Sequence, residues 1–109
     1  MRITVLAVPD CPNAPVAVGR ITAALAGRPA SVELVEVAGE AEATRLKMTG
    51  SPTILLDGVD PFAGAGAVPG VSCRIYRGSD GAAAGAPSVQ DLTAALSAAG
   101  LPGRSSAPC

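Results

Sequence analysis

The stretch ITVLAVPDCPNAPV, residues 3–16, decides the fold. Its first part, residues 3–8, is an almost continuous run of apolar, β-prone side chains, which is typical of a strand covered on both faces. The run ends at Pro9, and Cys11 follows between two prolines, where a helix is expected to begin. The stretch therefore predicts a central strand that passes directly into a helix, with one cysteine at the junction.

The next two segments extend this pattern. From about Ala14 to Ala26, apolar side chains recur every three or four residues, which predicts a helix that Gly27 and Pro29 end. Residues 31–37, SVELVEV, carry apolar side chains on both faces and predict a second strand. Because a helix joins the two strands, we expect them to be parallel with a right-handed crossover.

The remaining segments are shorter, and their bounds rest on turn residues and capping signals. The stretch S-V-Q-D that begins at Ser88 is similar to a capping box and starts the last helix. In chain order we expect a helix over 40–48 that Gly50 ends, a strand over 53–56 closed by the turn dipeptide Asp57-Gly58, a loop over 59–70, a half-exposed strand over 73–77, a loop over 78–87 and a helix over 88–100.

This order of elements, βαβαββα, predicts an α/β fold in three layers, with a four-stranded mixed sheet flanked by helices. The chain has 109 residues, which suits one domain, and we place that domain at 1–100. Residues 101–109 have little to bury, so we expect a disordered tail that leaves Cys109 exposed.

Composition excludes several classes of function. The net charge is −1, with one Tyr and one Phe, so the chain offers neither a basic surface nor stacking rings for nucleic acid. Histidine is absent, which removes His metal sites and the Ser-His and Cys-His pairs. No uncharged stretch is long enough to span a membrane, and the first residues do not resemble a secretion signal, so we expect a cytoplasmic protein.

Three cysteines stand at positions 11, 73 and 109, and the chain contains no C-x-x-C motif. This odd, widely spaced set fits neither a disulfide framework nor a closed zinc site. We therefore expect no metal site and no bound cofactor. Any cysteine chemistry concerns individual thiols.

Two motifs, at matching places in the order of elements, resemble the thioredoxin and glutaredoxin superfamily. Cys11-Pro12 follows the first strand, and Ser51-Pro52-Thr53 opens the third. The resemblance covers about residues 2–100 and implies a thioredoxin-like fold in which Pro52 is cis and lies against Cys11. It also implies that the Ser51 backbone is open to pair with an extended thiol ligand. From these three residues alone, Pro52 equally fits a proline that merely starts a strand.

The chain departs from dithiol members of that superfamily at the second cysteine. The motif here is Cys-Pro-Asn-Ala, with Ala14 in that place, so only monothiol chemistry remains. The resemblance then implies a thiol-disulfide oxidoreductase of the monothiol type. Cys11 would form a mixed disulfide that glutathione or a protein thiol resolves. The residues expected to bind the ligand around Cys11 are Pro12, Asn13, Ser51, Pro52 and Thr53.

Two residues compete to cap the first helix, and the choice decides how strongly the helix activates Cys11. If Cys11 is the N-cap, its sulfur meets the free N–H groups of the first turn, but Pro15 then removes the first hydrogen bond of the helix. If Asn13 is the N-cap, Pro15 is harmless and Cys11 lies outside the first turn. The carboxylate of Asp10 works against a thiolate in either case.

Cys73 is a candidate second thiol. If the fourth strand runs antiparallel to the third, Cys73 lies at the far end of the sheet, about 15 Å from Cys11. A disulfide needs Cα atoms within roughly 7 Å. We therefore expect a half-buried structural cysteine, unless the loop over 59–72 folds back over the end of the sheet that holds Cys11.

Three functions stay open. The first is thiol-disulfide exchange through Cys11. The second is a thioredoxin-like binding or accessory module without redox activity, which Ala14 and Asp10 favour. The third is handling of soft metals or organomercury compounds, because the opening VPDCPN over 8–13 also resembles sequences labelled alkylmercury lyase. That activity needs a cysteine pair that converges with a carboxylate, for which the candidates are Cys11, Cys73 and Asp10.

Overall fold

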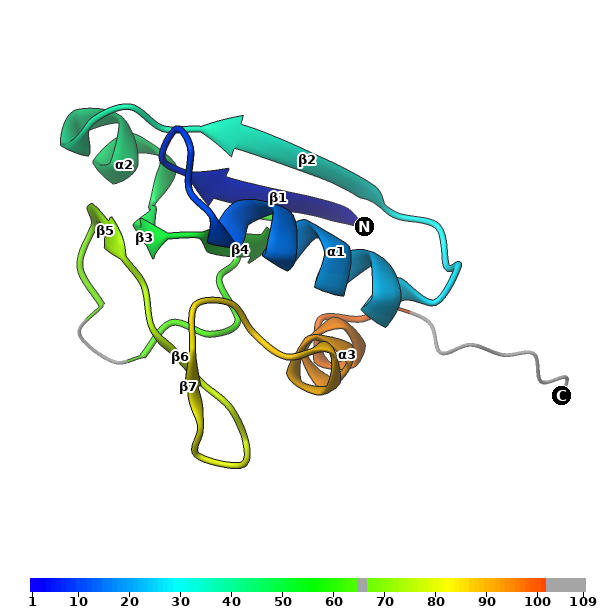
Figure 1. Ribbon diagram of the computed structural model, residues 1–109. Coiled ribbons are helices and arrows are strands. Elements are labelled where there is room, and N and C mark those ends of the chain that lie inside the picture. Colours follow the sequence, from blue (N-terminus) through cyan, green and yellow to red (C-terminus); the bar gives the residue numbers. More distant parts are fainter. Residues whose placement is uncertain (65–66, 102–109) are drawn as a thin grey trace, which may run out of the picture.

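The computed structural model describes residues 1–64 and 67–101 and shows a mixed α/β fold (Figure 1). Most elements lie within a few residues of their expected positions, and three short strands were not expected. In chain order the elements are β1 (Arg2–Ala7), α1 (Asn13–Leu25), β2 (Ser31–Glu36), α2 (Glu40–Leu46), β3 (Thr49–Ser51), β4 (Thr53–Leu56), β5 (Gly70–Cys73), β6 (Tyr76–Arg77), β7 (Ala83–Ala84) and α3 (Val89–Ala98).

The main sheet has the order β2-β1-β4, with β1 in the centre as expected. β1 pairs with β2 in parallel and with β4 in the antiparallel direction. Ile3, Val5 and Leu6 of β1 are almost completely buried, which explains why this strand is apolar along nearly its whole length.

Helices cover both faces of this sheet. A first core cluster joins Val5 of β1 and Ile54 of β4 to Ile21 of α1 and Leu92 of α3. A second cluster joins Leu6, the next residue of β1, to the side of the sheet that carries α2. Successive strand residues point to opposite faces, so the fold has three layers. Figure 1 shows α1 and α3 together on one face and α2 at the end of β2.

Residues 73–77, which were expected to form a fourth strand of the main sheet, contribute to two smaller strand pairs instead. β5 pairs in parallel with β3, and β6 pairs with β7 as a small antiparallel hairpin. In the described part of the chain, the main sheet thus has three strands. Cys73 lies opposite Ser51, so its expected position at the far end of the sheet is wrong. The chain before β5 folds back, which is the exception that the sequence left open.

Gly50 permits this close approach of β5. Its φ is +118°, and a Cβ atom here would lie 2.8 Å from the Cβ of Arg74 and 3.3 Å from the carbonyl oxygen of Ser72. Gly50 was expected to end the second helix, but α2 ends at Leu46, with Lys47 in the left-handed conformation as its C-cap. The glycine is needed for packing against β5 rather than for the helix end.

The last described residues close the domain. Ser88 caps α3 as expected, because its side chain accepts a hydrogen bond from the backbone N–H of Asp91 at 3.0 Å. Leu101, the first residue of the segment expected to be a disordered tail, is instead buried in the first core cluster, so the domain extends at least to this residue. The rest of the expected tail, including Cys109, lies outside the described residues. No helix in the described ranges is long and apolar enough to cross a membrane.

Two glycine substitutions test the contact between β3 and β5. Gly50→Ala should lower the free energy of unfolding by about 1–3 kcal/mol, because the new Cβ overlaps Arg74 and the backbone has positive φ. Gly19→Ala, in the interior of α1 with open space around it, should raise that free energy by about 0.5–1 kcal/mol. Urea unfolding followed by circular dichroism measures both. A neutral Gly50→Ala variant would contradict the tight packing of β5.

Candidate functional site

Cys11 lies in the turn between β1 and α1. Its side chain is half-buried, and its backbone N–H donates to the carbonyl oxygen of Val8 at 3.2 Å. The N-cap of α1 is Pro12, so neither expected capping residue occupies that position. Pro15 is the third helical residue, where an N–H has no partner within the helix, so this proline removes no hydrogen bond.

The first turn of α1 offers few free donors to the Cys11 sulfur. Pro12 and Pro15 have no N–H, and the N–H of Ala14 already donates to the Cys11 carbonyl oxygen at 3.2 Å. Cys11 itself precedes the cap. The support that a helix N-terminus usually gives a thiolate is therefore small in this chain.

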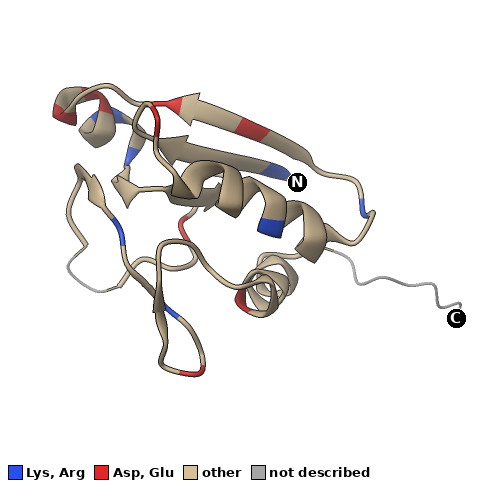
Figure 2. Cartoon of the chain, in the orientation of Figure 1, with Lys and Arg blue, Asp and Glu red and all other residues tan. Residues whose placement is uncertain are grey.

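A groove of about 350 Å³ opens beside Cys11. Carboxylates line it on two sides, Asp10 from the turn and Glu36 from β2, and none of the lining residues is Lys or Arg. Figure 2 shows acidic positions on β2 and on the loop that follows β1. The other lining residues are Ala7, Val8, Ala14, Pro15 and Leu34, which make most of the wall apolar.

The Ser51-Pro52 peptide bond is cis, as the resemblance implies. The side-chain oxygen of Ser51 accepts a hydrogen bond from the backbone N–H of Val8 at 3.0 Å, which ties this bond to the Cys11 turn. Ser51, Pro52 and Thr53 are all buried. Thr53 also uses its hydroxyl internally, since it donates to the Gly50 carbonyl at 2.5 Å. The sequence assigned these three residues to ligand binding; in the fold they are buried, and none of them lines the groove beside Cys11.

The backbone edge at Ser51 is filled by the chain itself. The Ser51 carbonyl oxygen accepts a hydrogen bond from the N–H of Arg74 at 3.1 Å, and Cys73 is the strand partner of Ser51. We expected this edge to be open to an extended thiol ligand. β5 occupies the place of such a ligand and brings its own cysteine there.

The other two expected binding residues are accessible but differ in their surroundings. Pro12 is exposed. Asn13 is half-buried, and a Cβ atom at Gly85 would overlap its side-chain amide. The Asn13 amide therefore lies directly on the Gly85 backbone, at the contact between α1 and the segment before α3. Cys11 and Asn13 are thus both half-buried, and Asn13 differs in that its amide already packs against Gly85.

A cluster of residues that the sequence did not reveal holds β5 in place. Arg74 and Asp60 form an ion pair at 2.6 Å, with side chains only 10% and 9% exposed. Thr49 of β3 joins both, since it donates to Asp60 at 3.2 Å and accepts from Arg74 at 3.0 Å. Asp60 also accepts the backbone N–H of Phe62 at 2.9 Å. Asp60 and Arg74 are 14 positions apart in the sequence. This separation lies outside any single helix or strand, so no local sequence pattern predicts the ion pair.

The two aromatic residues of the chain complete this cluster. The Tyr76 hydroxyl donates to the carbonyl oxygen of Pro52, and the Arg74 guanidinium lies 4.5 Å from the centre of the Tyr76 ring. The Phe62 ring meets Tyr76 edge-on, with centroids 5.6 Å apart. Burial raises the pKa of Tyr76 above its usual value; Arg74 lowers it and Asp60 raises it to smaller extents. We call Asp60, Phe62, Arg74 and Tyr76 the Arg74 cluster.

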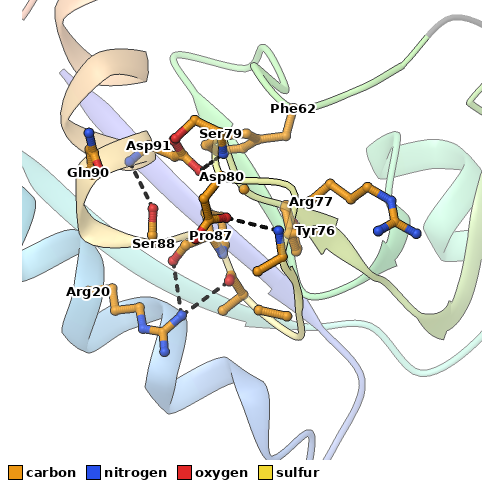
Figure 3. Close-up of a pocket in the computed structure, with 14 residues that line it drawn as sticks. Arg20, Phe62, Tyr76, Arg77, Ser79, Asp80, Pro87, Ser88, Gln90 and Asp91 are labelled. Carbon is orange, nitrogen blue, oxygen red and sulfur yellow. Dashed lines mark hydrogen bonds between the residues drawn. The ribbon is translucent and has the colours of Figure 1, made fainter.

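A second cavity, of about 160 Å³, lies between α1, α3 and the β6–β7 hairpin (Figure 3). Its main polar groups already have partners in the chain. Arg20 donates to the carbonyl oxygens of Ala86 and Pro87 at 3.2 and 3.3 Å, and Asp91 accepts the backbone N–H of Ser79 at 3.2 Å. These hydrogen bonds join the hairpin and the segment before α3 to the two helices. We therefore interpret the cavity as part of the packing between these elements and not as a binding site.

Comparison with known proteins gives no match to a family model, a curated protein or a solved structure. The site is therefore interpreted from its own residues. In the described ranges, no group of three or more His, Cys, Asp or Glu residues is placed to hold a metal ion.

The single tyrosine gives a direct test of the Arg74 cluster. Tyr76 is the only Tyr and the chain has no Trp, so phenolate absorbance in the near ultraviolet reports on this residue alone. In urea it should ionise near the ordinary pKa of about 10, and in the folded chain well above that. Above pH ~10 the unfolded chain releases a proton that the folded chain retains, so the free energy of unfolding should fall as pH rises. Equal midpoints in buffer and in urea would contradict the burial of the phenol.

Proposed function

We propose that this chain is a thioredoxin-like monothiol protein that exchanges disulfides through Cys11. The observation that carries the proposal is a free, half-buried thiol at the junction of the central strand and α1, on the wall of a groove of about 350 Å³. The arrangement of α1 and α3 on one face and α2 on the other supports it, as does the hydrogen bond from the Val8 N–H to Ser51, next to the cis bond.

The reaction needs no group beyond two thiols and a disulfide. The Cys11 thiolate attacks one sulfur of a disulfide, RSSR; the S–S bond breaks, and one thiolate leaves and takes a proton from water. A second thiol then attacks the mixed disulfide, which returns Cys11 to its reduced form. Each step forms one S–S bond and breaks one, so electrons balance without a cofactor.

The charges of the groove indicate the class of thiol. Asp10 and Glu36 line it without a neighbouring cation, so it favours neutral or cationic thiols. Glutathione carries two carboxylates and one ammonium group per molecule, and its net negative charge opposes those of the groove. A cationic small thiol, or a protein thiol flanked by Lys or Arg, fits better.

A variant with Cys73→Ser and Cys109→Ser isolates Cys11. Cystamine, a cationic disulfide, should form the mixed disulfide roughly tenfold faster than oxidised glutathione at low salt, and the ratio should approach one at high salt. Intact mass spectrometry over time measures both rates. Asp10→Asn with Glu36→Gln, added to this background, should also reduce the ratio, and adding Cys11→Ser should abolish both adducts.

Negative results have distinct meanings. Equal rates with cystamine and oxidised glutathione would contradict the proposed preference for cationic thiols. Reaction no faster than that of a short cysteine peptide at any pH would overturn the exchange function and favour a binding module without redox activity.

One observation supports organomercury cleavage as a second candidate function. Cys73 lies opposite Ser51, so both thiols are brought toward the same end of the sheet, and Asp10 precedes Cys11 on the same turn. Two thiolates are suitable soft ligands for Hg²⁺, which is the product of this reaction. In it the two thiols bind mercury and release their protons, the carbon–mercury bond breaks, the carbon takes one of these protons, the other goes to water, and Hg²⁺ stays on the two sulfurs.

Phenylmercury is a suitable probe for this second candidate. The unaltered chain, with excess small thiol to remove Hg²⁺, should release benzene, which gas chromatography detects. Cys11→Ser and Cys73→Ser should each abolish the release, while Cys109→Ser should leave it unchanged. No benzene above the level of the thiol alone would exclude the activity.

A further inference from the structure

We propose that Cys73 is an internal resolving thiol, which attacks the mixed disulfide at Cys11 and closes an intramolecular Cys11–Cys73 disulfide. The inference rests on the exchange function proposed above and names the partner of its second step. Both cysteines are free, and Cys73 is exposed while Cys11 is half-buried. Neither belongs to a C-x-x-C motif, so the second thiol comes from a distant part of the chain.

A chain of backbone and side-chain contacts connects the two cysteines through Val8 and Ser51. The Cys11 N–H donates to the Val8 carbonyl at 3.2 Å, and the Val8 N–H donates to the Ser51 side chain at 3.0 Å. Ser51 in turn is the direct strand partner of Cys73. The register of β3 and β5 shifts between Thr49 and Ser51, so the direction of the Cys73 side chain is inferred from its own pairing with Ser51 alone: paired residues share a face, which is the face from which Ser51 reaches Val8.

Two independent features hold Cys73 at this position. First, the backbone of Gly50 lies against Ser72 and Arg74, the two neighbours of Cys73. Second, the backbone N–H of Arg74 donates to the Ser51 carbonyl oxygen, and its guanidinium pairs with Asp60. β5 is thus fixed immediately before and after the cysteine.

The occupied edge at Ser51 also explains why the resolving thiol would be internal. An extended ligand that pairs with the Ser51 carbonyl would have to displace Arg74. A small disulfide can still reach Cys11 through the groove, because β5 does not line it. The first step then uses the groove, and the second uses the cysteine that the chain itself supplies at Ser51.

The second step balances in atoms and electrons. The Cys73 thiolate attacks the Cys11 sulfur of the mixed disulfide Cys11–S–S–R, a bond forms between the two protein sulfurs, and RS⁻ leaves and takes a proton. Over both steps the chain loses two hydrogens and RSSR becomes two RSH. A small thiol in excess reverses the sequence and regenerates the reduced chain.

The experiment uses the chain with Cys109→Ser, treated with cystamine and followed by intact mass and peptide mapping. The mixed adduct should appear first and then convert to a chain that lacks two hydrogens, with Cys11 linked to Cys73 at a rate independent of protein concentration. The same chain with Cys73→Ser should accumulate the mixed adduct and stop there.

The outcomes separate the two proposals. If the chain with both cysteines stops at the mixed adduct like Cys73→Ser, the resolving role is overturned while exchange at Cys11 stands. If no variant forms an adduct, the exchange function itself fails and the resolving role fails with it.

A shifted thiol provides the matched control. Cys73→Ser combined with Ser72→Cys moves the second sulfur by one residue, away from the position that pairs with Ser51. In the folded chain it should close the disulfide with Cys11 at least tenfold more slowly than Cys73. In urea, where the register is lost, both chains should close at similar rates. Equal rates in the folded state would show that chain flexibility, and not the register with Ser51, determines closure.

Discussion

The buried ion pair between Arg74 and Asp60 is the interaction on which the arrangement of the site depends. It joins Asp60, which follows β4, to Arg74, which follows β5. Thr49 connects the pair to β3. Removing one partner of a buried pair leaves an uncompensated charge, which costs roughly 3–5 kcal/mol. Arg74 also lies over Tyr76, and the Tyr76 hydroxyl donates to the Pro52 carbonyl. Arg74 therefore stabilises both β5 and the segment that holds the cis peptide bond.

Sequence patterns predicted the parts of this fold whose apolar residues repeat over at least four positions. β1, α1, β2, β4 and α3 lie within one or two residues of expectation, because their burial pattern is regular along the chain. β3 and β5 were missed because they are three and four residues long and rich in Gly, Ser and Thr. Their pairing depends on Gly50 and on a charge pair 14 residues apart, and neither has a local signature. Residues 73–77 alternate as one strand would, yet split between two strand pairs.

Cys11 lies at the strand–helix junction where the sequence placed it, while the roles of the site residues stay predictions. The helix cap is Pro12 rather than Cys11 or Asn13. Ser51 and Thr53, two of the expected binding residues, are buried. Only the three-dimensional fold shows that Glu36, 25 positions after Cys11, contributes to the same groove. The negative charge of the groove thus comes from Glu36 of β2 as well as from Asp10 of the cysteine turn.

The position of β2 at the edge of the main sheet affects how copies of this chain behave in concentrated solution. The outer edge of β2 has no strand partner in the described part of the chain, and Leu34 is 49% exposed. Two copies that paired through this edge in antiparallel fashion, with Leu34 opposite Val35, would place Glu33 of each opposite Glu36 of the other. Like charges in that position destabilise a strand pair. In that register, the acidic side chains of β2 therefore also oppose growth of the sheet from one molecule to the next.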